Sequence, residues 1–262
     1  MAVEDPEHLD QDATITLFFE LFNGLPQQGP GNAASTLRAL SLVPDLGSET
    51  RILDVGCGTG RQTRVLAQNS PARIIAIDNH PPFIDALNLE ARRLDLAGRV
   101  GARVADMRRL DFADASFDLI WCEGAIYIAG VETALRDWRR LLARGGHVAF
   151  SEVCWTKPDP PAECVSFWQR EYPAMRDATA LLNAIDGCGY ETVGHFMLPR
   201  SAWWDDYYGP LERNVAAFRA RYRGRPKAQE LADQTQREID IWKAYSDYYG
   251  YAFFVAGVGP PR

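Results

Sequence analysis

The sequence has no excess of basic charge and no long apolar run. Its 28 Lys and Arg residues are outnumbered by 35 Asp and Glu residues, which gives a net charge of −7. This balance argues against nucleic acid as the main partner, although one face of an acidic protein can still be basic. No apolar segment approaches the roughly 20 residues that span a bilayer, so no membrane insertion is expected.

Cysteine and targeting signals are equally sparse. The five cysteines are scattered and form no Cys-x-x-Cys pair, so they predict neither a disulfide framework nor a zinc site, and no metal is expected. The acidic segment Met1–Asp12 lacks the basic region and apolar core of a signal peptide. These absences together predict a cytoplasmic protein with reduced thiols.

A regular alternation of strand and helix patterns begins at Arg51. Strands are expected in the short apolar runs Arg51–Val55, Arg73–Asp78, Val100–Ala105, Phe117–Cys122 and His147–Val153. Helical patterns lie between them at Arg61–Gln68, Phe83–Leu94 and Thr133–Leu142. This alternation predicts an α/β fold with a parallel sheet and right-handed crossovers.

The two ends of the chain have a different pattern. Residues 1–45 are expected to form a helical lid, with helices at Ala13–Phe22 and Ala33–Leu42 separated by a turn rich in glycine and proline. After the fifth strand we expect, in order, a long helix at Ala162–Ile185, a strand at Glu191–Leu198, two helices at Ala202–Tyr222 and Lys227–Tyr248, and a last strand at Tyr251–Val258.

The most informative segment runs from Ile52 to Gly60 and reads ILDVGCGTG. A strand here enters a glycine turn that opens a helix. Glycine is needed where the backbone takes a positive φ or approaches a ligand without a Cβ in the way. A tight strand-to-helix turn would use the same residues, but this context favours cofactor binding.

The glycine spacing helps to choose the cofactor. Dinucleotide-binding loops follow Gly-x-Gly-x-x-Gly, whereas this loop reads Gly56-x-Gly58-x-Gly60 and has Arg61 at the third glycine position. The carboxylate of Asp54 would repel a pyrophosphate but suits a cationic amino-acid moiety. The pattern favours a cofactor without pyrophosphate, and an NAD-dependent oxidoreductase is the weaker alternative.

Acidic residues end the next two strands. Asp78 lies about twenty residues past the glycines, where a carboxylate binds ribose hydroxyls, although Asp78 could instead cap the helix that follows. Asp106 could accept a hydrogen bond from an adenine amine, with Met107 packing near the ring; a simple turn aspartate is the alternative. Glu123 and Tyr127 follow the fourth strand, at the edge where open α/β sheets bind ligands.

These residues resemble the class I S-adenosylmethionine-dependent methyltransferases over about Arg51–Val153. The segment Asp54–Gly60 is similar to the first motif of that family, Asp78 and Asp106 match its ribose-binding and adenine-binding acids, and Ala143–Val148 resembles the turn before its fifth strand. The resemblance implies S-adenosylmethionine as cofactor, S-adenosylhomocysteine as product and a small-molecule methyl acceptor. The expected cofactor-binding residues are Asp54, Gly56, Cys57, Gly58, Gly60, Asp78, Asn79, Asp106, Met107 and Glu123.

The resemblance also implies the complete fold. The family has a Rossmann-like, seven-stranded, mostly parallel sheet with an antiparallel last strand beside the fifth and helices on both faces. Residues 46–262 would form this domain, with residues 200–250 as added helices between the last two strands. Three shorter strings resemble a bacterial subgroup related to the ubiquinone and menaquinone biosynthesis methyltransferases: Gln28–Gly31, Glu123–Tyr127 and Tyr248–Tyr251.

A sulfonium methyl group is already electrophilic, so the protein mainly aligns the acceptor and excludes water. An oxygen or nitrogen acceptor can also use a base. The candidates are Glu123, Tyr127, His80 and Glu152, each with a structural alternative: Glu123 could contact the cofactor amino group, His80 could line the adenine pocket, and Tyr127 could only pack.

The C-terminal half is rich in aromatic residues, including Trp155, Trp168, Trp203, Trp204 and Tyr207. Aromatic rings suit a planar acceptor or a cationic amine, and they equally suit helix packing or a homodimer interface. The alternative to an enzyme is a non-catalytic module that binds the same cofactor.

Overall fold

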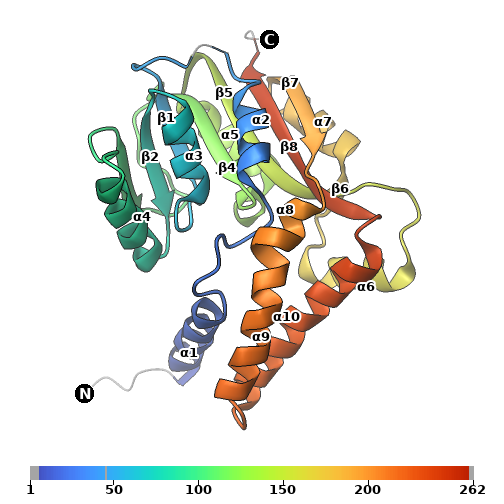
Figure 1. The fold of residues 1–262 in the computed structure, drawn as a ribbon. Helices are drawn as coiled ribbons and strands as arrows, with labels where there is room; N and C mark the ends of the chain where they lie inside the picture. The colour runs from blue at the N-terminus through green and yellow to red at the C-terminus, as the bar shows by residue number, and fades with distance from the viewer. Residues whose placement is uncertain (1–5, 45, 260–262) are drawn as a thin grey trace.

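The computed structural model describes residues 6–44 and 46–259. One mixed sheet runs through the molecule in the order β3-β2-β1-β4-β5-β8-β7, and the short β6 pairs with β5 (Figure 1). Its strands are β1 (Arg51–Val55), β2 (Arg73–Asp78), β3 (Val100–Val104), β4 (Phe117–Glu123), β5 (Leu142–Trp155), β6 (Arg176–Asp177), β7 (Tyr190–Met197) and β8 (Tyr249–Val258). Strands β1 to β5 are parallel, and β8 lies antiparallel between β5 and β7. This order is the Rossmann-like arrangement that the sequence predicts.

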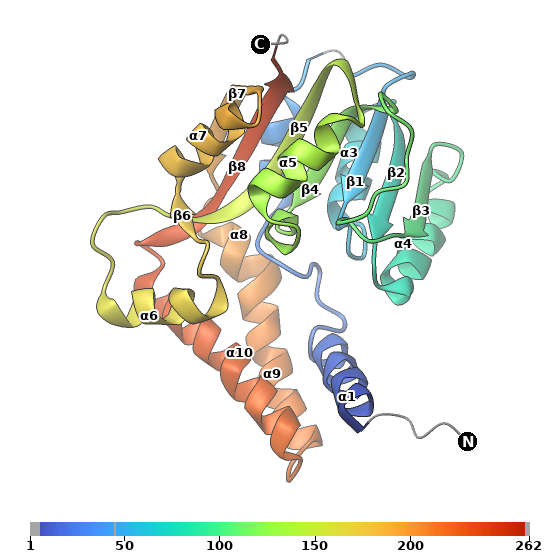
Figure 2. The same ribbon diagram turned by 180° about the vertical axis from the view of Figure 1, so that it is seen from behind.

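Helices cover both faces of the sheet. They are α1 (Pro6–Leu21), α2 (Ala33–Leu40), α3 (Arg61–Asn69), α4 (Pro81–Arg93), η1 (Ile126–Ile128), α5 (Val131–Arg139), α6 (Ala162–Glu171), α7 (Ala178–Gly187), α8 (Ser201–Trp203), η2 (Trp204–Tyr208), α9 (Gly209–Arg221) and α10 (Pro226–Tyr245). Figure 1 shows α2 and α3 in front of the sheet, and Figure 2 shows α5 and α7 on the opposite face. Beyond the carboxyl ends of the parallel strands lie α1, α6 and the α9–α10 hairpin.

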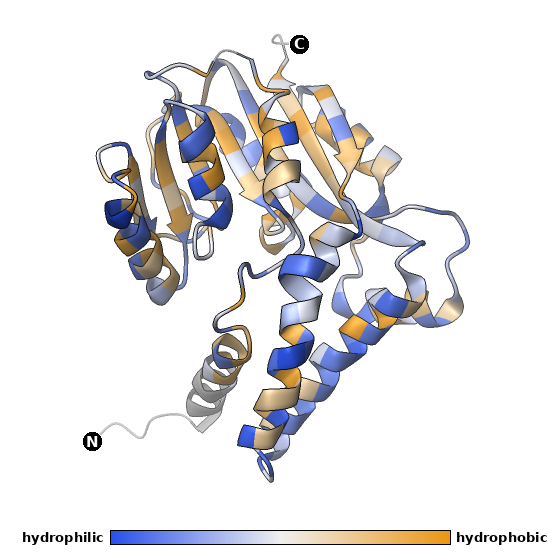
Figure 3. Cartoon of the chain, viewed as in Figure 1, coloured by the Kyte–Doolittle hydropathy of each residue, from blue (hydrophilic) through white to orange (hydrophobic). Residues whose placement is uncertain are grey.

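The core forms because the central strands are apolar on both faces. In β8, Phe253 packs toward Trp121 with ring centroids 5.3 Å apart, while its neighbour Phe254 stacks on Phe150 on the other face. Both phenylalanines are fully buried, and burial of one such side chain stabilises a fold by roughly 1.5–3 kcal/mol. Figure 3 shows the strands as the most hydrophobic elements and the α9–α10 hairpin as largely hydrophilic on its outer side.

The single long helix expected at Ala162–Ile185 is wrong. The structure has α6, then β6 beside Trp155, then α7. Pro173 follows the end of α6, and proline lacks the N–H that a continuing helix needs and disfavours helical geometry in the residue before it. Asp177 then caps α7 by accepting a hydrogen bond from the Ala180 N–H at 2.7 Å.

The added helices between β7 and β8 run from Ser201 to Tyr245. Their aromatic residues pack inside the chain: Trp203, Tyr207 and Tyr208 are buried, and the Trp204 ring stacks on Trp242. The aromatic residues of this segment therefore form an internal layer against β8.

Of the N-terminal segment expected to form a lid, residues 1–5 and 45 lie outside the described residues. The described part contains α1 and α2, and α1 packs against α9 and α10. Among the described residues, no helix combines the length and apolar character needed to cross a membrane, and no group of three or more His, Cys, Asp or Glu side chains is placed to hold a metal ion.

Candidate functional site

The glycine-rich loop joins β1 to α3 at the carboxyl edge of the sheet. Gly56 and Gly58 have φ angles of +71° and +53°, in the left-handed region that residues with a Cβ avoid. A Cβ at Gly56 would also lie only 2.6 Å from the Ala125 side chain. The N–H groups of Gly56 and Cys57 both donate to the Ile77 carbonyl at 2.9 Å, which ties the loop to β2. The loop therefore presents bare backbone to the space beside it.

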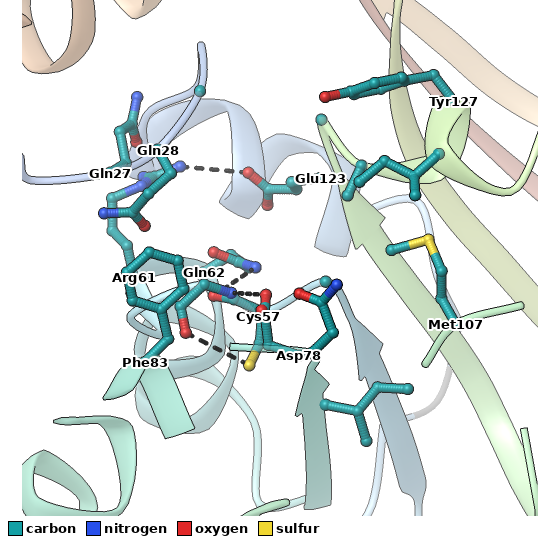
Figure 4. Close-up of a pocket in the computed structure, with 18 of the residues that line it drawn as sticks. Gln27, Gln28, Cys57, Arg61, Gln62, Asp78, Phe83, Met107, Glu123 and Tyr127 are labelled. Atoms are coloured by element: carbon teal, nitrogen blue, oxygen red, sulfur yellow. Dashed lines mark hydrogen bonds and ion pairs between the residues drawn. The ribbon is translucent and has the colours of Figure 1, made fainter. Parts of the chain in front are cut away.

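That space is a cavity with an empty volume of about 1090 Å³, which includes the solvent at its mouth (Figure 4). Of the cofactor-binding residues predicted from the sequence, all but Asp54 and Gly60 line it. Tyr127 lines it as well, and Figure 4 shows its hydroxyl pointing over the cavity. Residues that the sequence reasoning missed complete the lining, among them Phe19, Gln27, Gln28, Arg61, Gln62, Phe83 and Arg108.

Asp78 organises the loop as well as facing the cavity. Its Oδ2 accepts a hydrogen bond from the Gly58 N–H, and its Oδ1 accepts one from the His80 N–H, both at 3.0 Å. His80 is the N-cap residue of α4, so Asp78 stands two residues before the helix start and does not itself cap it. A carboxylate oxygen has two lone pairs, so both oxygens can still accept a hydrogen bond from a ligand hydroxyl.

Asp54, predicted to bind the cofactor, does not line the cavity. Asp54 is fully buried, and it accepts hydrogen bonds from the Thr63 hydroxyl at 2.5 Å and the Gln62 amide at 3.3 Å. Burial raises the pKa of Asp54 to about 7, and the negative charge of Glu123 contributes to the rise. Asp54 thus anchors the start of α3 beneath the loop.

Gly60 also lies outside the cavity lining. Its φ is +82°, and a Cβ at this position would lie 2.2 Å from the Leu87 side chain. The third glycine therefore allows α3 and α4 to approach each other, a packing role like that of the third glycine in dinucleotide-binding loops.

Glu123 is held by three donors. Its Oε1 accepts hydrogen bonds from the Thr36 hydroxyl at 2.7 Å and the Trp121 indole at 2.9 Å, and its Oε2 lies 3.2 Å from Arg61 Nη2. Burial raises the pKa of Glu123, and the charge of Arg61 opposes the rise. Glu123 therefore joins β4 to α2 and α3 while it lines the cavity, and its predicted catalytic role stays a prediction.

The ring of His80 packs between two phenylalanines. Its ring stacks on Phe19 with centroids 3.4 Å apart and meets the edge of Phe83 at 4.6 Å. Burial lowers the pKa of His80. His80 is not among the residues that line the cavity, and its ring joins α1 to α4; its predicted catalytic role stays a prediction.

Asp106 and Met107 form the wall of the cavity after β3. Asp106 pairs with Arg108 at 2.9 Å, and the hydrogen bonds from Arg108 hold the pKa of this carboxyl below its usual range. The Met107 methyl group lies 3.2 Å from the Cβ position of Gly56. The apolar side chain of Met107 and the ionised carboxylate of Asp106 thus lie next to each other in this wall of the cavity.

Two buried polar atoms on the opposite wall have no partner among the described residues. They are the Gln27 side-chain oxygen and the Arg61 Nε, and both residues line the cavity. A buried acceptor or donor without a partner costs about 1–3 kcal/mol, so such atoms mark positions that a ligand satisfies. The pair consists of one acceptor and one cationic donor, which suits an ammonium group and a carboxylate.

Three comparisons agree with this geometry. Residues 53–150 match the family model described as "Methyltransferase domain". A curated relative, methyltransferase GfsG of Streptomyces halstedii, is 30% identical over 110 residues, which is 42% of this chain and 40% of that protein. The matched part spans about half of the length of the curated relatives.

Solved structures share the fold over nearly the whole chain. One is a S-adenosylmethionine-dependent methyltransferase from Geobacter sulfurreducens in complex with S-adenosylhomocysteine, with 22% identity, a TM-score of 0.78 and coverage of 94% of this chain and 98% of that chain. Another is the [4+2]-cyclase SpnF, with 20% identity, a TM-score of 0.74 and coverage of 95% and 94%. The narrower resemblance to quinone-biosynthesis methyltransferases stays a prediction.

Proposed function

We propose that this chain, a member of the class I S-adenosylmethionine-dependent methyltransferases, transfers a methyl group to a small-molecule acceptor. The observation that carries the proposal is the pair of unpartnered atoms, Gln27 Oε1 and Arg61 Nε, opposite Asp78 in one cavity. The amino-acid end of the cofactor has an ammonium group and a carboxylate, and its ribose has two hydroxyls. The polar atoms in the cavity complement these groups.

Different residues of the cavity would bind different groups of the cofactor. Arg61 would hold the carboxylate and Gln27 the ammonium group, Asp78 would accept from the ribose hydroxyls, and Asp106 and Met107 would flank the adenine. When bound, the cofactor supplies a methyl group on a positively charged sulfur. The chain itself needs to position the acceptor in line with that methyl group and to exclude water.

The N-terminal segment supports water exclusion and would act as the predicted lid. Gln28 Oε1 lies 3.4 Å from both the N–H and the hydroxyl of Thr59, and Phe19 stacks on His80. Gln28 thus contacts the glycine loop and Phe19 contacts the start of α4, and both contacts support the proposal of a lid. Protection of residues 18–31 from hydrogen exchange should rise when S-adenosylhomocysteine binds, and an unchanged exchange rate would exclude a lid.

We also propose a cytoplasmic setting, on the basis of the cysteines. All five are buried and free, which agrees with a cytoplasmic protein that keeps its thiols reduced. The acidic composition disfavours nucleic acid as acceptor, and the homodimer considered from the sequence stays a prediction.

Calorimetric titration tests the cofactor. We expect micromolar binding of S-adenosylmethionine and S-adenosylhomocysteine, no binding of NAD, and loss of binding in Asp78→Ala. Asp85→Ala, on the exposed side of α4, is the matched control and should bind as the parent does. Binding of NAD alone would overturn the proposal. If the protein binds S-adenosylmethionine but transfers its methyl group to no compound in a small-molecule extract, the non-catalytic module is favoured.

A further inference from the structure

A second cavity lies at the end of β5, between α6 and the end of β7. Its empty volume is about 1540 Å³, which includes the solvent at its mouth. The described residues that line it share no member with those that line the cofactor cavity. Four aromatic rings line it, from Trp155, Trp168, Tyr172 and Phe196. The second cavity is therefore separate from the cofactor cavity, and its walls are mainly aromatic and apolar.

The walls of the second cavity are anchored to the sheet. Strand β6 pairs with the end of β5, where Asp177 lies opposite Trp155. Arg176, the other residue of β6, donates two hydrogen bonds to Glu132 of α5, at 2.5 and 3.0 Å. Three prolines of the connecting segments also line the cavity, and proline fixes the backbone φ. Such a cavity is pre-formed, as small-molecule sites usually are, so a ligand does not need to order it.

The charged side chains of this lining already have partners. Of the described residues that line the second cavity, only Lys157 and Asp177 carry a full charge. Lys157 Nζ lies 3.8 Å from an oxygen of Asp247, and the carboxylate of Asp177 accepts a hydrogen bond from the Ala180 N–H at 2.7 Å. An ion that left water for this cavity would lose its hydration without gaining a free counterion, which is costly. The lining therefore favours a neutral ligand.

The rings and the methionines of the lining favour a flat ligand. Trp168 and Phe196 are only 8% and 7% exposed and form fixed apolar walls, whereas Tyr172 is partly exposed. Aromatic rings offer large apolar faces on which another ring can stack. Met175 and Met197 complete the lining, and thioethers adapt to irregular shapes and make favourable contacts with aromatic rings.

Tyr172 and Tyr127 form the boundary between the two cavities. Tyr172 lines the second cavity and Tyr127 lines the cofactor cavity, and their rings meet edge to face with centroids 5.8 Å apart. Tyr127 is 44% exposed, and Figure 4 shows its hydroxyl over the cofactor cavity. One pair of tyrosine rings thus separates the cavities at this point. A molecule that occupies both must be longer than a single ring.

We propose that the second cavity binds the body of the methyl acceptor, and that this acceptor is an elongated, neutral molecule with a flat aromatic body. The proposal rests on the proposed function and adds the substrate class. The aromatic body stacks among the rings of the second cavity, and the reacting end extends past Tyr127 to the cofactor. A charged acceptor would lose its hydration in this cavity, and an acceptor of one ring would not reach from one cavity to the other.

Methionine methyl groups report on the two cavities separately. Of the four methionines in the chain, Met107 lines the cofactor cavity, and Met175 and Met197 line the second cavity. Protein with ¹³C-labelled methionine methyl groups is saturated with S-adenosylhomocysteine and titrated at about pH 7.5, where an ordinary histidine is mostly neutral. The neutral probes are 4-hydroxystilbene and 4-hydroxybiphenyl, and their charged partners are stilbene-4-carboxylate and biphenyl-4-carboxylate.

We expect at least one neutral probe to shift the signals of Met175 and Met197 and to bind about tenfold or more tightly than its carboxylate partner. Met197→Glu places a negative charge in the second cavity, so it should weaken binding of that probe by about tenfold or more and leave the affinity for S-adenosylhomocysteine unchanged. Val193→Glu is the matched control, because Val193 is on the same strand, is 47% exposed and lines neither cavity; it should bind the probe as the parent does.

Three results would overturn the proposed site and ligand class: probe shifts confined to Met107, no neutral probe preferred over its partner, or Met197→Glu binding like the parent. The role as acceptor site requires contact with the cofactor. A bound probe should therefore show a nuclear Overhauser effect to the methylene protons beside the sulfur of S-adenosylhomocysteine, and its absence for every bound probe would overturn that role. Failure of S-adenosylhomocysteine itself to bind, with an unshifted Met107 signal, would instead contradict the proposed function.

Discussion

The Thr36 hydroxyl donates a hydrogen bond to Glu123 Oε1 at 2.7 Å across 87 residues of sequence. This bond joins α2, in the N-terminal segment, to the end of β4 at the wall of the cofactor cavity. The same carboxylate also binds Trp121 and Arg61. The N-terminal segment is therefore part of the site, and loss of this bond should affect both the stability of the fold and the binding of the cofactor.

Replacement of Thr36 by valine removes that donor and preserves the shape of the side chain. We expect a loss of about 1 kcal/mol in the free energy of unfolding and weaker binding of S-adenosylmethionine. Chemical denaturation and calorimetry measure the two effects. Thr36→Ser keeps the hydroxyl and should restore both; equal behaviour of the valine and serine variants would show that the bond contributes nothing.

Arg61→Lys tests the assignment of the amino-acid end of the cofactor. Lysine keeps the positive charge beside Glu123 but has no Nε–H in a planar group. A lost hydrogen bond to a charged group costs about 1.5–3 kcal/mol, so the affinity for S-adenosylhomocysteine should fall by about tenfold to a hundredfold.

The control for Arg61→Lys is a change of ligand. 5′-Methylthioadenosine has the adenosyl group without the carboxylate, so its affinity should be the same in the parent and in Arg61→Lys. An equal loss for both ligands would place Arg61 in a structural role only.

Gly60→Ala should destabilise the fold by about 2–4 kcal/mol. The added Cβ would meet Leu87 at 2.2 Å, and the backbone has a φ of +82°; overpacking and left-handed strain both contribute. Gly47→Ala is the matched control, because its Cβ would meet nothing within 4 Å. In thermal unfolding, Gly47→Ala should behave as the parent, and Leu87→Ala added to Gly60→Ala should recover less than the whole loss, because the backbone strain remains.

Glu152 predicts a pH dependence of stability. Burial raises its pKa to about 8 from the ordinary value of 4.5, although the neighbouring Tyr172 and Arg176 oppose the rise. The folded state therefore holds this proton more tightly than the unfolded state. The resulting stabilisation is fully present below pH 4.5 and is lost as the pH rises toward about 8.

Glu152→Gln removes this titration. The stability of the variant relative to the parent should therefore increase from about pH 5 to about pH 8, by on the order of 2–4 kcal/mol. Denaturation at several pH values measures it, and parallel stability curves for the two proteins would contradict the assigned pKa.

Local patterns predicted the sheet well, because apolar runs bounded by turns identify strands directly. The bounds expected for β1 and β2 are those observed, Arg51–Val55 and Arg73–Asp78. The helix expected across Pro173 failed because its apolar periodicity was followed past a residue that cannot continue a helix. The proline itself was the signal that could have corrected it.

Some residues of the site could be predicted from local sequence patterns, and others could not. Residues at the carboxyl ends of strands, such as Asp78 in β2 and Glu123 in β4, could be singled out because parallel strands end at one edge of a sheet. Gln27 comes from a turn far away in sequence, and nothing in its local pattern shows that it reaches the cavity. Likewise, the inward direction of Asp54 depends on donors from α3, Gln62 and Thr63, that the strand pattern does not include.

The α9–α10 hairpin leaves the sheet after β7 and returns at β8, two strands that are hydrogen-bonded neighbours. Both ends of the hairpin are thus fixed by the same ladder, whereas most of the cavity lining comes from the matched domain at residues 53–150. Recombination that exchanges this hairpin between relatives would leave the ladder and the glycine loop intact. The hairpin can thereby diverge in evolution while the glycine loop and the sheet beside it are inherited unchanged.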